Sequence, residues 1–68
     1  MNLVFVTSSN VSAIGYQDGV LEVHFRNGYV YQYLNTSQSL FNELYAAPSK
    51  GQFVHQRLKD KYPTRRIR

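Results

Sequence analysis

The residues of this 68-residue sequence with the clearest chemical use are tyrosines and basic side chains. Three tyrosines alternate along one short segment, at Tyr29, Tyr31 and Tyr33. Their rings can stack on nucleic-acid bases, which contributes about 1–3 kcal/mol per base, and their hydroxyls can form hydrogen bonds. Tyrosines paired across a sheet also stabilise the sheet itself, and a helix or a partner chain could cover them. The sequence leaves both interpretations open.

The basic residues gather at the C-terminal end of the chain. Eight Lys and Arg residues stand against four Asp and Glu, which gives a net charge of +4. Residues 50–68 hold seven basic residues and one acid, Asp60, so this segment carries +6 and residues 1–49 carry −2. Such asymmetry can mark a surface that faces a polyanion, although a solvated helix face followed by a frayed basic tail has the same composition. In the polyanion interpretation, phosphates would contact Arg26, Lys50, Arg57, Lys61, Arg65, Arg66 and Arg68.

Catalytic and metal chemistry find little support. Neither His24 nor His55 has a carboxylate or a second histidine at a spacing typical of metal ligands. The sequence has no Gly-x-Ser-x-Gly elbow, no phosphate-binding glycine loop and no cysteine, and its four carboxylates are scattered. We therefore predict a binding protein that is not an enzyme and has neither a cofactor nor a metal site.

The first half of the chain predicts a three-stranded antiparallel meander. Asp18-Gly19 and Asn27-Gly28 are favoured two-residue hairpin turns, because these residue types tolerate positive φ. The turns delimit strands rich in β-branched and aromatic residues, at about 11–17, 20–26 and 29–34. Residues 2–6 could add a further N-terminal strand.

A two-residue turn at Asn27-Gly28 also predicts which side chains share a face of the sheet. It pairs Arg26 with Tyr29, and counting onwards it pairs His24 with Tyr31 and Leu21 with Leu34. The core face would then hold Ile14, Tyr16, Leu21, Val23, Phe25, Val30 and Leu34. The opposite face would hold the three tyrosines, interleaved with Glu22, His24 and Arg26.

The second half predicts two short helices, so the expected fold class is α+β. Asn35, Thr36 and Ser37 offer N-caps for a first helix that Pro48 ends. Ser49 caps a second helix that would run to Pro63. Its apolar stripe would contain Val54, Leu58 and Tyr62, and a basic line of Lys50, Arg57 and Lys61 would border that stripe. Residues 63–68 would form a basic, flexible tail.

Several short motifs occur in a recognisable order: Ser8-Ser9, Ile14-Gly15-Tyr16, Leu21-x-Val23-x-Phe25, Asn27-Gly28, Tyr31-x-Tyr33, Leu44, Ala47-x-Ser49-x-Gly51-x-Phe53 and Tyr62. In this order the chain resembles the KTSC domain, named for its place at the C-terminus of some lysyl-tRNA synthetases and also found as a free-standing small bacterial protein. The resemblance implies one domain over residues 1–62, a β-meander followed by helices, and RNA binding, with Tyr31 and Tyr33 as suspected contacts. Thr36-Ser37 stands where such domains usually have Val-Pro.

Three functions remain in view. The first is binding of RNA, including tRNA, through the basic end and the tyrosine face. The second is a protein-interaction module, including a homodimer that closes over the tyrosines. The third is a small phage- or host-encoded inhibitor that binds a protein or a signalling nucleotide. No apolar run approaches the roughly 18 residues that span a bilayer and no signal peptide is evident, so we expect a cytoplasmic protein without a membrane partner.

Overall fold

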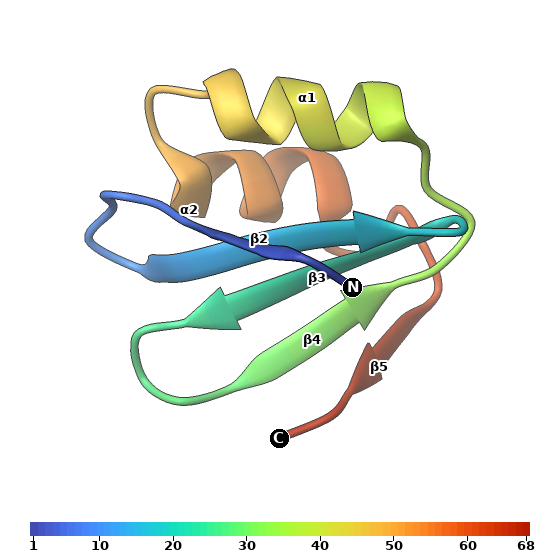
Figure 1. Cartoon of the computed structure of the whole chain (residues 1–68), viewed down its shortest axis with the longest axis horizontal. Coiled ribbons are helices and arrows are strands. Elements are labelled where there is room, and N and C mark those ends of the chain that lie inside the picture. The colour runs from blue at the N-terminus through green and yellow to red at the C-terminus, as the bar shows by residue number, and fades with distance from the viewer.

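A five-stranded antiparallel sheet forms one layer of the computed structural model, which describes residues 1–68 (Figure 1). The strands lie in chain order: β1 (Leu3–Phe5), β2 (Val11–Gln17), β3 (Val20–Phe25), β4 (Val30–Tyr33) and β5 (Thr64–Arg66). Between β4 and β5 the chain forms α1 (Gln38–Ala46), α2 (Lys50–Phe53) and a π-helical continuation, η1 (Val54–Leu58), which form a layer on one face of the sheet. The predicted α+β class, the meander, the N-terminal strand and the two helical segments are confirmed. None of the helices is long and apolar enough to cross a membrane.

The turn between β2 and β3 is the two-residue hairpin that the sequence predicts. Asp18 and Gly19 both have positive φ, at 51° and 83°, and Gln17 pairs with Val20 across the turn. Positive φ at both central residues matches the twist of the flanking strands. Ile14 pairs with Val23, and Tyr16 pairs with Leu21, so these four side chains share one face, as predicted.

The turn between β3 and β4 differs from the prediction by one residue. Only Gly28 has positive φ there, at 98°, and its N–H donates to the Phe25 carbonyl oxygen at 3.0 Å. The Phe25 N–H donates to the Tyr29 carbonyl oxygen at 2.8 Å, so the loop contains three residues, 26–28. A three-residue loop of this kind places a glycine in the left-handed conformation as a bulge. The register predicted from a two-residue turn is therefore wrong.

The shifted register exchanges the faces of β4. Leu21 pairs with Tyr33 and Val23 pairs with Tyr31, so both tyrosines lie on the helix-covered face. His24 pairs with Val30, and Glu22 pairs with Gln32. Val30 is buried, but its side chain lies on the face opposite the helices. Leu34 is only partly buried. A one-residue shift in register moves every side chain of a strand to the other face of the sheet. This explains why the faces predicted for the β4 side chains are wrong.

The helices begin where the sequence places them, and the second ends early. The Ser37 hydroxyl accepts a hydrogen bond from the Leu40 N–H at 3.1 Å, and the Ser49 hydroxyl accepts one from the Gln52 N–H at 3.3 Å. The helical segment that starts at Lys50 ends at Leu58, four residues short of the predicted stripe residue Tyr62. Lys61 consequently lies in a turn and not on the helix.

The core fills the space between the sheet and the helices. Its buried members come from three strands and both helical segments: Val11, Ile14, Leu21, Val23, Tyr33, Leu40, Leu44, Phe53, Val54 and Leu58. Burial of side chains of this size contributes about 1.5–3 kcal/mol each. Tyr33, expected on the far face, is therefore a core residue.

The C-terminal segment is a strand. Tyr31 pairs with Arg66, and Tyr33 pairs with Thr64, and the ladder continues beyond β5, where the Ile67 N–H donates to the Val30 carbonyl oxygen at 2.7 Å. The expectation of an unpaired flexible tail over residues 63–68 is wrong. Pairing holds the arginines of this segment in fixed positions beside β4 (Figure 1).

Gly28→Ala tests the bulged turn. An alanine Cβ at this position would meet no atom within 4 Å, so the whole cost comes from the φ of 98°. We expect the free energy of unfolding to fall by about 1–2 kcal/mol in urea denaturation. Ser39→Ala, at an exposed position inside α1, is the control and should change it by less than about 0.5 kcal/mol. Equal stability of Gly28→Ala and the unmodified chain would contradict the turn geometry.

Candidate nucleic-acid interface

A hollow of about 580 Å³ opens between the helical segment α2–η1 and the strands β3, β4 and β5. We call it the η1 hollow. It lies on the helix-covered face, where the register brings β4 and β5 together below the helix. Its lining combines aromatic, basic and polar side chains: Phe25, Tyr31, Tyr33, Gly51, Val54, His55, Lys59, Asp60, Thr64 and Arg66.

Aromatic rings form one wall of the η1 hollow. The ring centroids of Phe25 and Tyr31 are 5.6 Å apart with planes at 71°, an edge-to-face contact. Tyr29 lies 6.3 Å from Tyr31, measured between centroids, and its ring is exposed. Tyr31 is half-buried by this packing but still lines the hollow. Of the three predicted tyrosines, Tyr29 and Tyr31 therefore keep accessible surface.

Tyr33 is the most buried of the residues that line the hollow. It is only 3% exposed, and burial, together with the neighbouring Tyr31, raises the pKa of its hydroxyl to about 12. The hydroxyl makes no hydrogen bond within the chain, yet no buried polar side-chain atom is left unsatisfied. The oxygen therefore keeps accessible surface, and the side chain that carries it lines the hollow. A protonated hydroxyl there can both donate and accept.

Arg66 links the hollow to the exposed tyrosine. Pairing with Tyr31 places Arg66 on the same face, and its guanidinium carbon lies 4.8 Å from the centroid of the Tyr29 ring. This cation–π contact holds the guanidinium over an aromatic face. Lys59 adds a second cation, and Asp60, with φ of 62°, adds one carboxylate.

A second hollow, of about 510 Å³, adjoins the first. It is lined by Ser9, Asn10, Phe25, Arg26, Asn27 and Gly51, so the two hollows share Phe25 and Gly51. A Cβ on Gly51 would come within 2.6 Å of the Asn10 side-chain nitrogen, which shows how closely the two sides of this hollow approach. A hydrogen bond holds the Arg26 side chain, whose Nε donates to the Ser8 carbonyl oxygen.

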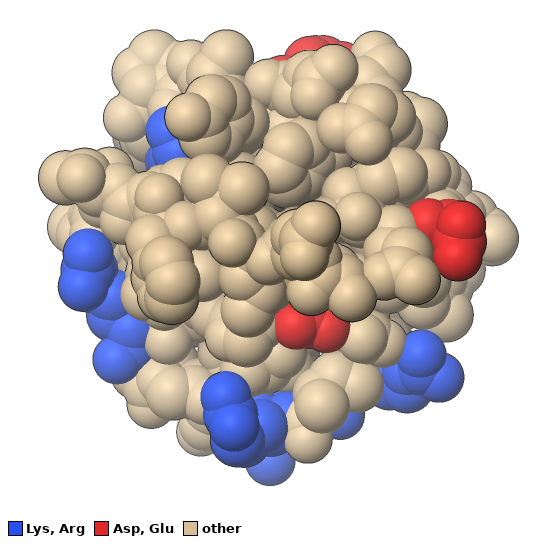
Figure 2. All heavy atoms as spheres, viewed as in Figure 1, with Lys and Arg blue, Asp and Glu red and all other residues tan.

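Basic side chains follow the side of the molecule that carries β4 and β5. Figure 2 shows Lys and Arg side chains along its lower edge, where Figure 1 places β4, β5 and the C-terminus. The segment from the end of η1 to the chain end supplies most of the positive charge. We call its five members the C-terminal basic group: Lys59, Lys61, Arg65, Arg66 and Arg68.

Two of the predicted basic residues have other partners. The Lys50 Nζ donates to the carbonyl oxygens of Tyr45, at 3.0 Å, and Ala47, at 2.8 Å, and so satisfies the C-terminal end of α1. Arg57 pairs with Glu43 at 3.0 Å, and its guanidinium lies over the Phe53 ring at 5.0 Å. With Lys61 outside the helix, the predicted basic line of Lys50, Arg57 and Lys61 does not exist as one surface.

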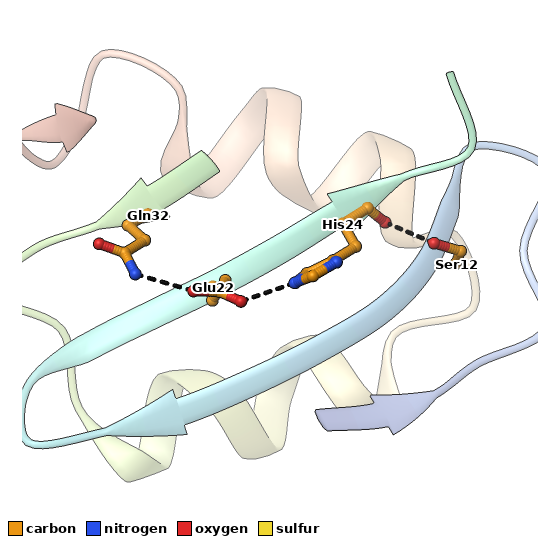
Figure 3. Close-up of polar contacts among 4 residues, drawn as sticks. All are labelled: Ser12, Glu22, His24 and Gln32. Atoms are coloured by element: carbon orange, nitrogen blue, oxygen red, sulfur yellow. Dashed lines mark hydrogen bonds and ion pairs between the residues drawn. The ribbon is translucent and has the colours of Figure 1, made fainter. Parts of the chain in front are cut away.

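The face where the tyrosines were expected carries a row of hydrogen-bonded polar side chains instead, which we call the polar chain; Figure 3 shows its members Gln32, Glu22 and His24. Arg65 donates to the Gln32 side-chain oxygen at 2.8 Å, Gln32 donates to Glu22 at 2.7 Å, and Glu22 contacts His24 Nε2 at 2.6 Å. The polar chain thus runs across three neighbouring strands, from β5 through β4 to β3. Arg65 therefore projects from this open face, while Arg66 projects toward the η1 hollow.

The pKa of Glu22 responds to this environment. Partial burial raises it, but the hydrogen bonds from Gln32 and His24, with the charges of His24 and of the Met1 amine, outweigh burial and hold the pKa below its ordinary value of 4.5. A depressed carboxyl pKa means that ionised Glu22 stabilises the fold above this ordinary value. The contribution is lost as the pH falls through the folded-state pKa. No group of three or more His, Cys, Asp or Glu side chains is placed to hold a metal ion.

The comparisons with known proteins agree with this architecture. The family model of the KTSC domain matches residues 7–62. The chain belongs to the KTSC domain family. It is also similar to the crystal structure of a KTSC domain protein from Yersinia pestis, with 35% sequence identity, a TM-score of 0.87, and coverage of 98% of this chain and 97% of that one. A comparison with curated proteins found no match.

Sequence reasoning missed part of the lining of the η1 hollow. His55, Lys59 and Thr64 were not singled out as site residues, because they come together only when β5 pairs with β4. Phe25, predicted on the core face, packs against the core and also lines the hollow. An available signal was the pair of β-branched residues Thr64 and Ile67 after Pro63, but the basic composition favoured a tail.

Glu22→Gln tests the polar chain of the open face. Ionised Glu22 stabilises the fold, and this contribution is lost as the pH falls through the depressed pKa of the carboxyl. We therefore expect the free energy of unfolding, measured by urea denaturation, to fall less for the variant than for the unmodified chain between about pH 6 and pH 3. Glu43→Gln breaks an exposed pair worth less than about 1 kcal/mol and is the control. Parallel pH curves for Glu22→Gln and the unmodified chain would show that Glu22 has no such role.

Proposed function

We propose that the protein is a binding module for single-stranded nucleic acid, chiefly RNA and including tRNA, and that it is not an enzyme. The observation that carries the proposal is the Arg66 guanidinium held 4.8 Å over Tyr29 beside a hollow walled by Tyr31. A guanidinium stacked on a ring keeps N–H donors for phosphate oxygens, and the rings beside it offer faces for bases.

The surrounding charge supports the same function. Five basic residues follow one another from Lys59 to Arg68, with Asp60 as the only acid among them, and the whole chain carries +4. Such a distribution attracts a phosphate backbone, and each neutralised phosphate releases counterions. Binding should therefore weaken steeply as salt rises.

Single strands suit this surface better than duplexes. Tyr31 is half-buried in the wall of a hollow, so only an unpaired base that leaves its stack could reach the ring. Proteins that read RNA usually recognise loops and ends for this reason. We also propose the cytoplasm, where such strands occur, as the location of this protein.

Arg66→Gln tests the proposal against a matched charge change. We expect the variant to bind a 12-nucleotide single-stranded RNA about five- to tenfold more weakly at 50 mM salt, and its salt dependence to fall by roughly one phosphate contact, measured by fluorescence anisotropy. Arg57→Gln removes the same charge from a residue already paired with Glu43, and it should change affinity by less than about twofold.

An unmodified chain with no affinity tighter than about 10⁻⁴ M at 50 mM salt would end the proposal, because that is a weak non-specific level. Equal losses for Arg66→Gln and Arg57→Gln would show that only net charge matters, and would remove the special role of Arg66.

A second candidate function, self-association, rests on the other edge of the sheet. β1 is an edge strand of uncharged residues, and Phe5 is 83% exposed. An apolar edge strand with unpaired backbone groups can pair with the same strand of a second copy. The opposite edge, β5, carries Arg65 and Arg66, whose like charges oppose such pairing.

Phe5→Lys tests this second candidate. If β1 joins two copies, the unmodified chain should form dimers at hundreds of micromolar in sedimentation equilibrium, and Phe5→Lys should be monomeric at the same concentrations. Ile67→Lys adds the same charge at another exposed apolar residue and should leave the dimer intact. A monomer at every concentration for the unmodified chain would eliminate the candidate.

A further inference from the structure

We propose that the η1 hollow receives one unstacked nucleotide of the bound strand, with its base against Tyr31 and its phosphate at Lys59 and Arg66. This inference rests on the proposed nucleic-acid binding and adds to it the ligand of one defined site. It predicts that a mononucleotide alone occupies the hollow.

The Tyr33 hydroxyl is the strongest sign that the hollow is built for a ligand. The residue is 3% exposed and belongs to the core, yet its hydroxyl keeps accessible surface without a partner in the chain, and the side chain lines the hollow. A phenylalanine would supply the same packing without a polar atom. An accessible hydroxyl on a core residue, without a partner inside the chain, is available to a polar group that enters the site, such as the edge of a base.

The size of the hollow suits one nucleotide. Its volume of about 580 Å³ lies within the range of roughly 300–1,000 Å³ that is usual for small-molecule sites. The rings of Phe25 and Tyr31 in the wall are nearly perpendicular. They therefore do not form a continuous platform, and we expect a single base to stack there. One base per hollow is therefore the expected occupancy.

The lining of the hollow contains charged groups of both signs. Lys59 and Arg66 can hold a phosphate, whereas the Asp60 carboxylate repels phosphate and can accept hydrogen bonds from an exocyclic amino group of a base. Asp60 forms no ion pair, and its backbone has φ of 62°, in the left-handed region that asparagine and aspartate tolerate. His55 and Thr64 complete the polar lining.

Isothermal titration with 5′-AMP and with ribose 5-phosphate tests the site. The two ligands share the phosphate and the sugar, so their difference measures the base. We expect AMP to bind at least about fivefold more tightly, as one stacked base should contribute about 1–3 kcal/mol. Equal affinity of the two ligands would overturn the inference, because it would leave only a phosphate contact.

Tyr33→Phe tests whether the Tyr33 hydroxyl contacts the nucleotide. The variant keeps the core ring, and we expect AMP affinity to fall about three- to tenfold, the effect of one lost hydrogen bond. Tyr16→Phe is the control, because the Tyr16 hydroxyl accepts from the Gly19 N–H at 3.1 Å at the other hairpin and does not line the hollow. An unchanged AMP affinity in Tyr33→Phe, or an equal loss in Tyr16→Phe, would contradict the assignment.

Anisotropy with the 12-nucleotide RNA separates this inference from the proposed function. RNA binding together with the expected AMP preference supports both. RNA binding without an AMP preference overturns the nucleotide site and leaves the basic surface in place. Binding of AMP without any binding of RNA overturns the inference as stated, because the hollow would then serve a free nucleotide and the proposed function would have failed.

Discussion

The pairing of β3 with β4 through a three-residue turn determines what this protein can present to a ligand. Gly28, at φ of 98°, allows Phe25 to face Tyr29 across the loop, and this shifts the strand by one residue from the two-residue alternative. The shift places Tyr31 and Tyr33 below the helices. A glycine is suited to this position because positive φ costs other residues about 1–2 kcal/mol.

The C-terminal strand completes the site that this register begins. β5 pairs with β4, so Arg66 lies on the same face as Tyr31, and Arg65 lies on the opposite face in the polar chain with Gln32. Two neighbouring arginines therefore have different roles. Alternation along a strand separates them, which no reading of charge along the sequence would show.

The sequence predicted the elements better than their relative placement. The Asp18-Gly19 turn and the caps at Ser37 and Ser49 depend on local chemistry, and the predictions at these three places are confirmed. The Asn27-Gly28 pair suits two loop lengths, so local chemistry alone could not fix the register. β5 was missed because its pairing is between residues about 33 positions apart, such as Gln32 and Arg65, and composition carries little information about such contacts.

The position of the tyrosines has a functional consequence. A row of exposed rings on the open face would have offered a flat stacking platform, whereas the observed arrangement buries Tyr33, half-buries Tyr31 and exposes Tyr29 beside Arg66. The proposed recognition therefore depends on a hollow between two layers, bordered by strand and helix. Glu22, His24 and Gln32 occupy the face that the tyrosines would have used.

Amide chemical-shift mapping by NMR, with a short single-stranded RNA added to the labelled protein, tests the central claim most directly. If the ligand enters between η1 and the sheet, the largest shifts belong to Tyr31, His55, Lys59 and Arg66, and those of Glu22 and Gln32 on the open face stay small. The largest shifts at Glu22, His24 and Gln32, with the hollow residues unmoved, would contradict the account.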